Sequence, residues 1–321
     1  MIALLRKCVD MLFLLRLWLL APVWTVLILG WIVGNQNARV GEFEYGTLFI
    51  NLLGFSLLVA SIYIVNQIRD VESDRINRKL FLLPQGIISI PAAWTAAIIC
   101  TAAGLAIAWT QGPWMFALFI TGFVIGILYN LPPASLKDRA TGGVIANSLG
   151  HGAITFLVGW LAAKTGQAIS AELLIPGLLS SLAPGFANGA VYLATTIPDA
   201  AGDRMTGKKT FCVTHGEKAT AVAAAVMCAL ALGASFLMLL ENNFWVMTVP
   251  AALSLGVFVN FALTTKRESA FYSFKWPVLL LTIFVTMFVP VYGVLIIVTF
   301  IASKIYYKRR FGITYPTFKP K

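Results

Sequence analysis

The sequence predicts an all-α integral membrane protein with about nine transmembrane helices. Its 321 residues are 59% hydrophobic and only 12% charged, whereas soluble globular proteins carry roughly 25% charged residues. The apolar residues recur in runs of about 20, which is long enough to cross ~30 Å of hydrocarbon. These runs lack the alternation of barrel strands, so in lipid they must form a helical bundle. A secreted domain, a cytosolic enzyme and a fibrous protein are excluded.

The apolar runs also predict where each helix lies. The first run follows Arg6 and Lys7 and is too long for the core of a signal peptide, so it is interpreted as a span. The nine predicted spans are approximately 11–33, 47–65, 91–110, 114–130, 143–163, 173–197, 219–240, 244–263 and 276–302.

The positive charges predict the orientation of these helices. The formal net charge is +11, from 24 Lys and Arg against 13 Asp and Glu. With the N-terminus inside, the loops after spans 2, 4, 6 and 8 hold 13 basic residues, while the opposite loops hold only Arg39 and Lys164. Basic loops stay on the cytoplasmic side, so the charge indicates topology and attraction to anionic lipid headgroups, and no nucleic-acid binding.

The basic C-terminal tail, residues 304–321, disagrees with a count of nine spans. Nine spans place this tail on the outer side, where the positive-inside rule disfavours it. Either the tail is tolerated there because it comes last, or the number of spans is not nine.

Two of the inner loops resemble each other and predict an internal repeat. Asp70 and Asp74 are followed by Arg75 and Lys79, and 129 residues later the same pattern returns. The repeated residues are Asp199, Asp203, Arg204 and Lys208. Four spans separate the two motifs, so both face the same side, as in a parallel repeat. We predict one domain, 1–321, made of two pseudo-repeats, about 11–140 and 141–270, with a final helix and a basic tail.

The acidic motifs indicate a magnesium and diphosphate site. Asn66, Asp70 and Asp74 recur every four residues and form one stripe on a helix. Four carboxylates near one interface would repel unless cations lay between them, and hard oxygen ligands suit Mg²⁺ bound together with substrate phosphates. The neighbouring Arg and Lys side chains suit the remaining phosphate oxygens. One DxxxD pair alone is a weak signal, but two such pairs, each followed by Arg and Lys, are much more specific.

A diphosphate attached to an apolar tail explains why a polar site accompanies a membrane-embedded body. Once Mg²⁺ and basic residues neutralise the diphosphate, it becomes a good leaving group, and an allylic C–O bond can ionise. The resulting cation must be shielded from water. The 22 Phe, 9 Trp and 9 Tyr can supply a dry wall and negative π-faces.

Three segments of the chain resemble the signatures of the UbiA superfamily of intramembrane prenyltransferases. They are NQIRDVESDRINRK at 66–79, IPDAAGDRMTGKKTFCVTHG at 197–216, and YNLPPASLK at 129–137, which is similar to the family's Y-x-x-P-P-x-x-x-K loop. The resemblance implies a UbiA-like fold and a Mg²⁺-diphosphate site held by Asn66, Asp70, Asp74, Asp199 and Asp203. It also implies that Lys137 contacts the phosphates and that Arg16 corresponds to the family's Arg near the start of its first helix.

The motif forms NQxxDVExD and IPDxxGD look most like the branch of the family that prenylates homogentisate. Two departures leave the acceptor open. Asn77, Arg78 and Lys79 stand where that branch has Asn-Lys-Pro, and Thr195 replaces a Tyr four residues before the second motif. Transfer to a carotenoid or chlorophyll-type lipid and an intramembrane terpene cyclase remain alternatives. A carrier of phosphorylated lipids is disfavoured because the acidic motifs cluster at one face.

Two polar residues of the fifth span, Asn147 and His151, lie at membrane depth, where polar residues are often functional. His151 could orient an acceptor hydroxyl or take its proton, with Asn147 beside it. Alternatively, it makes a hydrogen bond between packed helices.

The sequence thus predicts Mg²⁺-dependent transfer of a prenyl group from an isoprenyl diphosphate to a hydrophobic, aromatic acceptor that resembles a quinone precursor, with release of pyrophosphate. In a prokaryote the enzyme would lie in the inner (plasma) membrane with its active-site loops facing the cytosol. The substrate-binding residues are expected to be Asn66, Arg16, Arg75, Lys79, Arg204, Lys208, His151 and Asn147.

Overall fold

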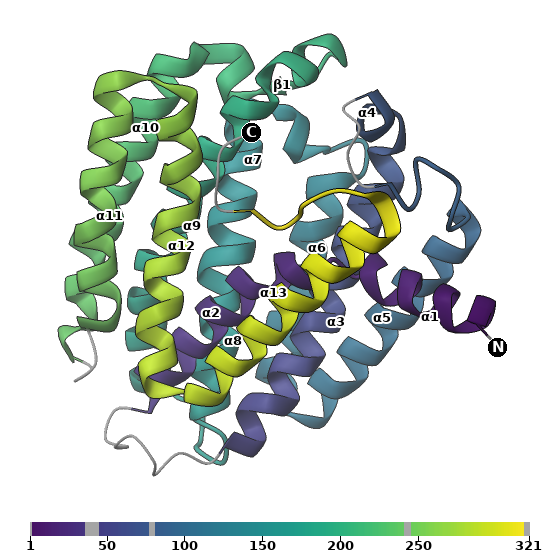
Figure 1. Cartoon of the computed structure of the whole chain (residues 1–321). Coiled ribbons are helices and arrows are strands. Elements are labelled where there is room, and N and C mark those ends of the chain that lie inside the picture. Colours follow the sequence, from purple (N-terminus) through teal and green to yellow (C-terminus); the bar gives the residue numbers. More distant parts are fainter. Residues whose placement is uncertain (1, 36–44, 77–80, 241–244, 318–321) are drawn as a thin grey trace.

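The computed structural model describes residues 2–35, 45–76, 81–240 and 245–317, and it is a bundle of α-helices (Figure 1). Ten helices of the described chain are long and apolar enough to cross a membrane. They are α2 (Leu17–Gly34), α3 (Tyr45–Arg69), α5 (Ile90–Thr110), α6 (Pro113–Asn130), the composite helix Ala140–Ala163, α9 (Ala171–Met205), α10 (Phe211–Ser235), α11 (Trp245–Thr264), α12 (Arg267–Phe288) and α13 (Pro290–Phe311). The predicted all-α membrane fold is confirmed, but the count of nine spans is wrong.

The additional span lies at the C-terminus, where the sequence predicts one helix over 276–302. The structure ends α12 at Phe288 and begins α13 at Pro290. Proline lacks the N–H that a continuing helix needs and disfavours helical geometry at the preceding residue, here Val289. With ten spans, the chain would return to the side on which it began, so we expect the described part of the basic tail, residues 304–317, on the same side as the acidic loops.

The N-terminal span is also shorter than predicted. Arg16 adopts a left-handed conformation, with φ 58° and ψ 48°, and separates α1 (Ile2–Leu14) from α2. The short helix α1 is tied to the far end of the chain, because Asp10 accepts hydrogen bonds from the Tyr306 hydroxyl at 2.7 Å and from Nε of Arg310 at 3.0 Å. The first and last helices therefore pack together at the end of α13.

A cysteine-labelling experiment tests the ten-span topology. In a background that carries Cys8→Ser, single cysteines are introduced at the exposed positions Thr206, Gln167 and Thr314. We expect Thr206→Cys and Thr314→Cys to react with an impermeant reagent from the same side, and Gln167→Cys from the other. Labelling of Thr314→Cys together with Gln167→Cys would restore the nine-span topology.

The packing of α2 against α8 (Thr155–Ala163) has the symmetry expected of an internal repeat. A Cβ atom added to Gly30 would clash with the carbonyl oxygen of Phe156, and one added to Gly159 would clash with that of Leu27. Gly30 and Gly159 are 129 residues apart, as are Leu27 and Phe156, which is the spacing of the two acidic motifs. The reciprocal contact thus recurs at the spacing of the acidic motifs, and the division into two related halves stays a prediction.

Close approach of these two helices depends on glycine, so Gly30→Ala is expected to lower the stability of the folded protein by at least about 1–3 kcal/mol, the usual cost of overpacking. Gly256→Ala is the matched control, because its new Cβ would meet no atom within 4 Å in α11. Thermal unfolding in detergent compares the two variants. Equal unfolding midpoints for the two variants would show that α2 and α8 can move apart without loss of stability.

One end of the bundle, here called the polar end, carries α4 (Val71–Ile76), the 3₁₀ turn η1 (Leu136–Asp138) and the short strand β1 (Lys209–Thr210). The remaining assigned elements are η2 (Ser148–Ile154), between α7 (Ala140–Asn147) and α8, and η3 (Phe236–Leu240). Parallel bridges join Arg139 to Lys209 and Ala140 to Thr210, and so bring the loop after α6 beside the second acidic motif.

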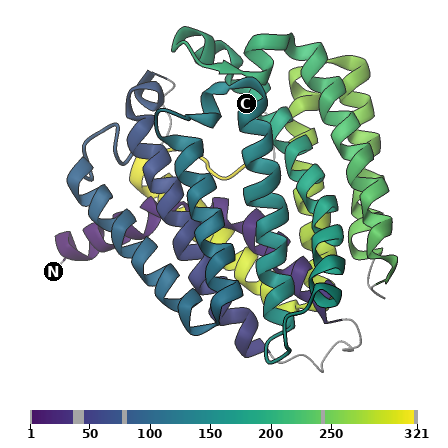
Figure 2. The ribbon, with the colours of Figure 1, turned by 180° about the vertical axis from the view of Figure 1, so that it is seen from behind.

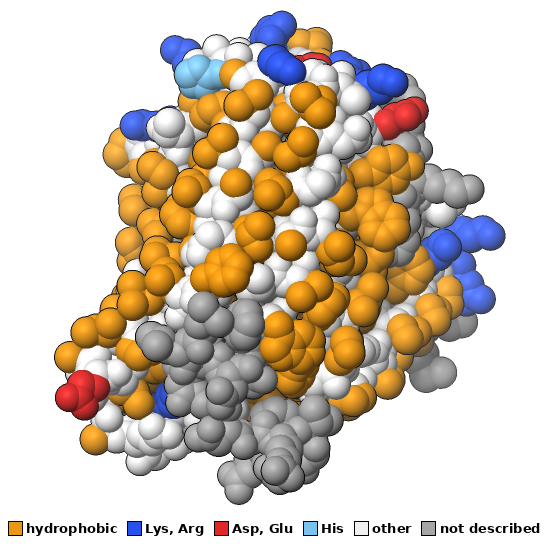
Figure 3. All heavy atoms as spheres, turned by 90° about the vertical axis from the view of Figure 1, so that its left-hand side faces the viewer, with side chains coloured by type: hydrophobic (Ala, Val, Ile, Leu, Met, Phe, Trp, Pro, Cys, Tyr) orange, Lys and Arg blue, Asp and Glu red, His pale blue; other side chains and the backbone are white. Residues whose placement is uncertain are grey.

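The arrangement of the helices places an apolar body beneath the polar end. From behind, the helices α3, α5 and α6 lie on one side and α9, α10 and α11 on the other (Figure 2). The space-filling view shows an apolar surface over most of the height of the bundle, with charged side chains gathered mainly at its upper end (Figure 3). An apolar belt of this kind is what lipid requires of an integral membrane protein.

Candidate active site

Asp70 lies at the junction between the end of α3 and the start of α4. The helical spacing continues through this junction, because the Asp70 N–H donates to the Asn66 carbonyl at 3.0 Å and the Asp74 N–H donates to the Asp70 carbonyl at 2.7 Å. Nδ2 of Asn66 also donates to Oδ2 of Asp70 at 3.0 Å. Asn66 and Asp70 therefore lie on one face, as the spacing predicts, and Asp74 follows as a buried side chain.

Two lysines from distant segments meet at the same oxygen of Asp70. Nζ of Lys137 is 2.8 Å from Oδ1 of Asp70, and Nζ of Lys208 is 3.2 Å from it. Lys208 also lies 4.0 Å from Oδ1 of Asp203, whose other oxygen accepts from the Thr210 hydroxyl at 3.3 Å. Lys208 thus joins the first acidic motif to the second. With Lys137, the segments 66–79, 129–137 and 197–216 all meet at the polar end.

The charges in this cluster stabilise one another. Burial alone raises the pKa of the Asp70 carboxyl, but Lys137 and Lys208 outweigh burial and hold that pKa below its ordinary value. Burial lowers the pKa of the Lys208 ammonium, and the Asp70 and Asp203 carboxylates more than reverse this and raise it. Asp70 is therefore anionic and Lys208 cationic at neutral pH.

Asp199, Arg204 and Arg75, three other predicted site residues, lie exposed at the polar end. Asp199 and Arg204 belong to the last turns of α9, where Asp199 and Asp203 keep the predicted spacing of four residues. Arg75 contacts Oε2 of Glu72 at 2.9 Å rather than either acidic motif. Lys79 lies outside the described residues.

Arg16 is not brought to the acidic motifs. Its guanidinium carbon lies 5.8 Å from the centre of the Tyr63 ring, and it lines a small pocket with Tyr307 and Tyr315. Within the described part of the chain, no hydrogen bond or ion pair connects Arg16 to the aspartates.

The donor set at the polar end fits a magnesium ion that is shared with a substrate. Within the described ranges, no three Asp, Glu, His or Cys side chains are grouped closely enough to hold a metal by themselves. The Asp70 carboxylate is contacted by the ammonium groups of Lys137 and Lys208 rather than by other carboxylates. Mg²⁺ is commonly held by only one or two carboxylates together with water and substrate phosphates. Carboxylates flanked by lysines, as here, suit this shared mode of binding.

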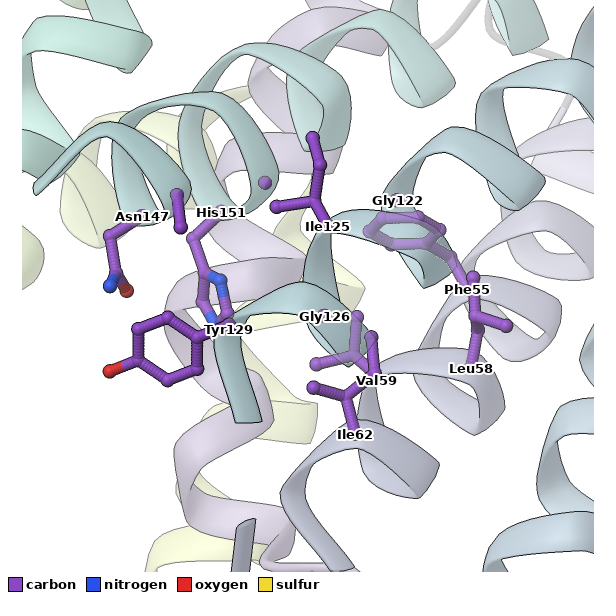
Figure 4. A pocket seen from close by; sticks show the side chains of 12 residues that line it. Phe55, Leu58, Val59, Ile62, Gly122, Ile125, Gly126, Tyr129, Asn147 and His151 are labelled. Atoms are coloured by element: carbon purple, nitrogen blue, oxygen red, sulfur yellow. The ribbon is translucent and has the colours of Figure 1, made fainter. Parts of the chain in front are cut away.

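A cavity lies between α3, α6 and the composite helix (Figure 4), and its lining residue Ile62 precedes Asn66 by one helical turn. Asn66 and Asn130 lie just above this cavity, because Asn66 follows the lining residue Ile62 on α3 and Asn130 follows the lining residue Tyr129 on α6. The two asparagines are joined by a hydrogen bond from Nδ2 of Asn66 to Oδ1 of Asn130 at 2.9 Å. The cavity is lined by Phe55, Leu58, Val59 and Ile62 of α3, Gly122, Ile125, Gly126 and Tyr129 of α6, and Ala146, Asn147, Gly150 and His151. Its walls are therefore mainly apolar, with a few polar groups near the polar end.

The two polar residues predicted in the fifth span, Asn147 and His151, both line this cavity. His151 belongs to η2, a π-helical segment, and such segments are rare and frequent at functional sites. Its Nε2 lies 2.9 Å from the Tyr63 hydroxyl. Sequence reasoning missed Tyr63 and Asn130, although Asn130 belongs to the Tyr129–Lys137 segment and Tyr63 precedes Asn66 by one helical turn.

Comparisons with known proteins also point to the UbiA prenyltransferase family. A model of the UbiA prenyltransferase family matches residues 22–279. Homogentisate phytyltransferase from Synechocystis sp. is 29% identical over 185 residues, which cover 57% of this chain and 59% of that protein. Digeranylgeranylglyceryl phosphate synthase from Thermococcus kodakarensis is 31% identical over 208 residues, which cover 64% and 70%. The chain spans about 60% of the length of the first curated relatives that it matches.

Solved structures show the same fold. A UbiA homologue from Archaeoglobus fulgidus bound to GPP and Mg²⁺ matches with a TM-score of 0.63 and 20% identity, over 91% of this chain and 99% of that one. A UbiA homologue from Aeropyrum pernix K1 matches with a TM-score of 0.68 and 17% identity, over 84% and 96%. With most of its length matched by the family model, this chain belongs to the UbiA prenyltransferase family.

Proposed function

We propose that this protein transfers a prenyl group from an isoprenyl diphosphate to a hydrophobic, aromatic acceptor within the membrane, in a Mg²⁺-dependent reaction. The observation that carries this proposal is the convergence of both acidic motifs on Lys208, one helical turn above an apolar cavity. A diphosphate bound at the polar end can extend its prenyl chain into that cavity. The positive-inside rule places the polar end in the cytosol, and in a prokaryote the membrane is the inner one.

The donor diphosphate is bound by residues of both motifs. Lys137 and Lys208, which contact Asp70 in this structure, turn to the phosphate oxygens and so leave Asp70 free to hold a metal ion. Mg²⁺ supplies charge neutralisation that makes the diphosphate a better leaving group. The residues that would hold the ion with the diphosphate are Asn66, Asp70, Asp74, Asp199 and Asp203, with Arg204 on the exposed side.

The reaction separates charge across the boundary between the polar end and the cavity. The bond between the allylic carbon and the diphosphate oxygen breaks, and pyrophosphate leaves with the electron pair. Lys137 and Lys208 stabilise the developing negative charge, and the ring faces of Phe55 and Tyr129 can stabilise the allylic cation in the cavity. An acceptor carbon forms the new bond and then loses its hydrogen as a proton.

An aromatic acceptor is supported by relatives whose names specify one, homogentisate phytyltransferase and 2-acylphloroglucinol 4-prenyltransferase from Humulus lupulus. Other relatives are named for a glyceryl phosphate acceptor. The cavity favours the aromatic class, because its lining is mainly apolar and its polar groups, Asn147 and His151, are suited to hydroxyl groups.

The test is mass spectrometry of products formed by the purified protein in lipid nanodiscs. Geranyl, farnesyl and geranylgeranyl diphosphates are each supplied with Mg²⁺ and with homogentisate, glyceryl phosphate lipid or no acceptor. We expect a prenylated aromatic product together with pyrophosphate. A cyclic hydrocarbon without acceptor would instead identify a terpene cyclase, and products only with the glyceryl lipid would contradict an aromatic acceptor.

A further inference from the structure

Tyr63 on α3 connects the wall of the cavity to the start of α2. Its hydroxyl oxygen lies 2.9 Å from Nε2 of His151 and donates to the Leu19 carbonyl at 3.2 Å. His151 lines the cavity, and Tyr63 does not. On its other side, the Tyr63 ring faces the Arg16 guanidinium at 5.8 Å. Tyr63 is thus held between two elements and reaches the cavity only through His151.

The two contacts of the Tyr63 hydroxyl indicate which nitrogen of His151 carries the proton. A tyrosine hydroxyl has one hydrogen, and a backbone carbonyl can only accept. Both contacts are hydrogen bonds only if Tyr63 donates to the Leu19 carbonyl and Nε2–H of His151 donates to Tyr63. Nε2 is then protonated and Nδ1 keeps its lone pair, since the partner of one ring nitrogen fixes the state of the other.

The remaining nitrogen of His151 is available to a ligand in the cavity. Among the described residues, the only hydrogen bond of the imidazole is the one to Tyr63. The π-helical turn that carries His151 widens the helix at this point, beside Gly150 and Gly152, which lack side chains. Because His151 lines the cavity, a lone pair on its Nδ1 can accept a hydrogen bond from a hydroxyl group of a ligand there.

We propose that Tyr63 is a positioning residue that holds His151 with Nε2 protonated, so that Nδ1 accepts a hydrogen bond from a phenolic hydroxyl of the acceptor. This proposal rests on the proposed prenyl transfer, and it limits the class of acceptors to phenols. The hydrogen bond fixes the plane of the acceptor ring and increases its electron density, so that a ring carbon is presented to the allylic carbon. Acceptors without a free hydroxyl lose this orientation.

A spectroscopic test needs no knowledge of the natural acceptor. The chain has two histidines, so His215→Gln leaves His151 as the only source of imidazole signals in protein labelled with ¹⁵N-histidine. We expect the proton-bearing nitrogen to be Nε2 and Nδ1 to be unprotonated. In Tyr63→Phe, these signals should shift or average. The control is Tyr292→Phe, which removes a buried hydroxyl that likewise donates to a carbonyl of α2, that of Ala21, and it should leave His151 unchanged.

Two spectroscopic results would overturn the proposal. One is a proton on Nδ1 of His151 in the otherwise native protein. The other is a His151 spectrum that Tyr63→Phe leaves unaltered.

A kinetic test separates positioning from general damage. With geranyl diphosphate as donor, homogentisate and its dimethyl ether are compared as acceptors, and pyrophosphate release without acceptor is measured in parallel. Tyr63→Phe should lower kcat/KM for homogentisate by about tenfold, the effect of one lost hydrogen bond. It should leave the dimethyl ether and the acceptor-independent release unchanged, as should Tyr292→Phe for every substrate.

The outcomes also distinguish this proposal from the proposed function itself. If Tyr63→Phe slows acceptor-independent pyrophosphate release as much as transfer, its role is structural and the positioning proposal is wrong. If the unaltered protein releases no pyrophosphate from any isoprenyl diphosphate, prenyl transfer itself is wrong, while the His151 spectrum still decides whether Tyr63 sets the protonated nitrogen.

Discussion

Replacing Asp70 with alanine is expected to lower the rate of prenyl transfer by at least about a hundredfold, the loss caused by removing one preorganised charged group from a transition-state site. Among the residues that the structure describes, Asp70 alone contacts Asn66, Lys137 and Lys208 together. Its loss removes a proposed metal ligand and leaves two ammonium groups without the carboxylate that they share. Pyrophosphate release from the donor, with and without acceptor, measures the effect.

Glu72→Ala is the matched control for Asp70→Ala. Glu72 lies two residues away in α4, is exposed and contacts Arg75, but it falls off the stripe of Asn66 and Asp70. The Glu72→Ala variant should therefore retain nearly full activity. Asp70→Asn, which keeps the size of the side chain, guards against a variant that fails to fold. Activity of a folded Asp70→Asn equal to that of Glu72→Ala would remove Asp70 from the site.

Removal of divalent metal is expected to abolish turnover completely, and added Mg²⁺ should restore it. The described residues form no metal cage of their own, so the ion should be held mainly through the diphosphate and exchange quickly. Chelation by EDTA should therefore act within seconds rather than hours. The Mg²⁺ concentration for half-maximal rate should fall as the donor concentration rises.

Two results would contradict this account of the metal. Full pyrophosphate release in the presence of EDTA would show that lysines and arginines alone activate the leaving group. A Mg²⁺ requirement that is independent of donor concentration would indicate a metal bound by the protein alone.

The fold was largely predictable because transmembrane helices are encoded locally, in the length of each apolar run. The exceptions occur at breaks inside such runs. Pro290 interrupts 276–302 and Arg16 interrupts 11–33, and both could have been recognised as local signals, a proline and a charged residue within a span. The glycines that pair α2 with α8 recur in the segments LGWIVG at 29–34 and VGWLAA at 158–163, at the spacing of the acidic motifs.

The site was predictable only as far as its residues share a local pattern. The stripe of Asn66 and Asp70 follows from helical periodicity, and the structure has it. The contact between Lys208 and Asp70 joins residues 138 positions apart and depends on how the segments that follow α3 and α9 meet at the polar end. The π-helical turn at His151 and the Tyr63 contact likewise arise from packing, and a single sequence carries no period that reports them.

Electron paramagnetic resonance of Mn²⁺, substituted for Mg²⁺, tests most directly whether the two acidic motifs form one diphosphate site. The probe is geranyl thiolodiphosphate, an unreactive donor analogue, added to the protein in nanodiscs. We expect a bound-Mn²⁺ signal only when protein and analogue are both present, and we expect Asp70→Ala and Asp203→Ala each to abolish it. A signal that either variant leaves unchanged would show that the two motifs do not share the ion.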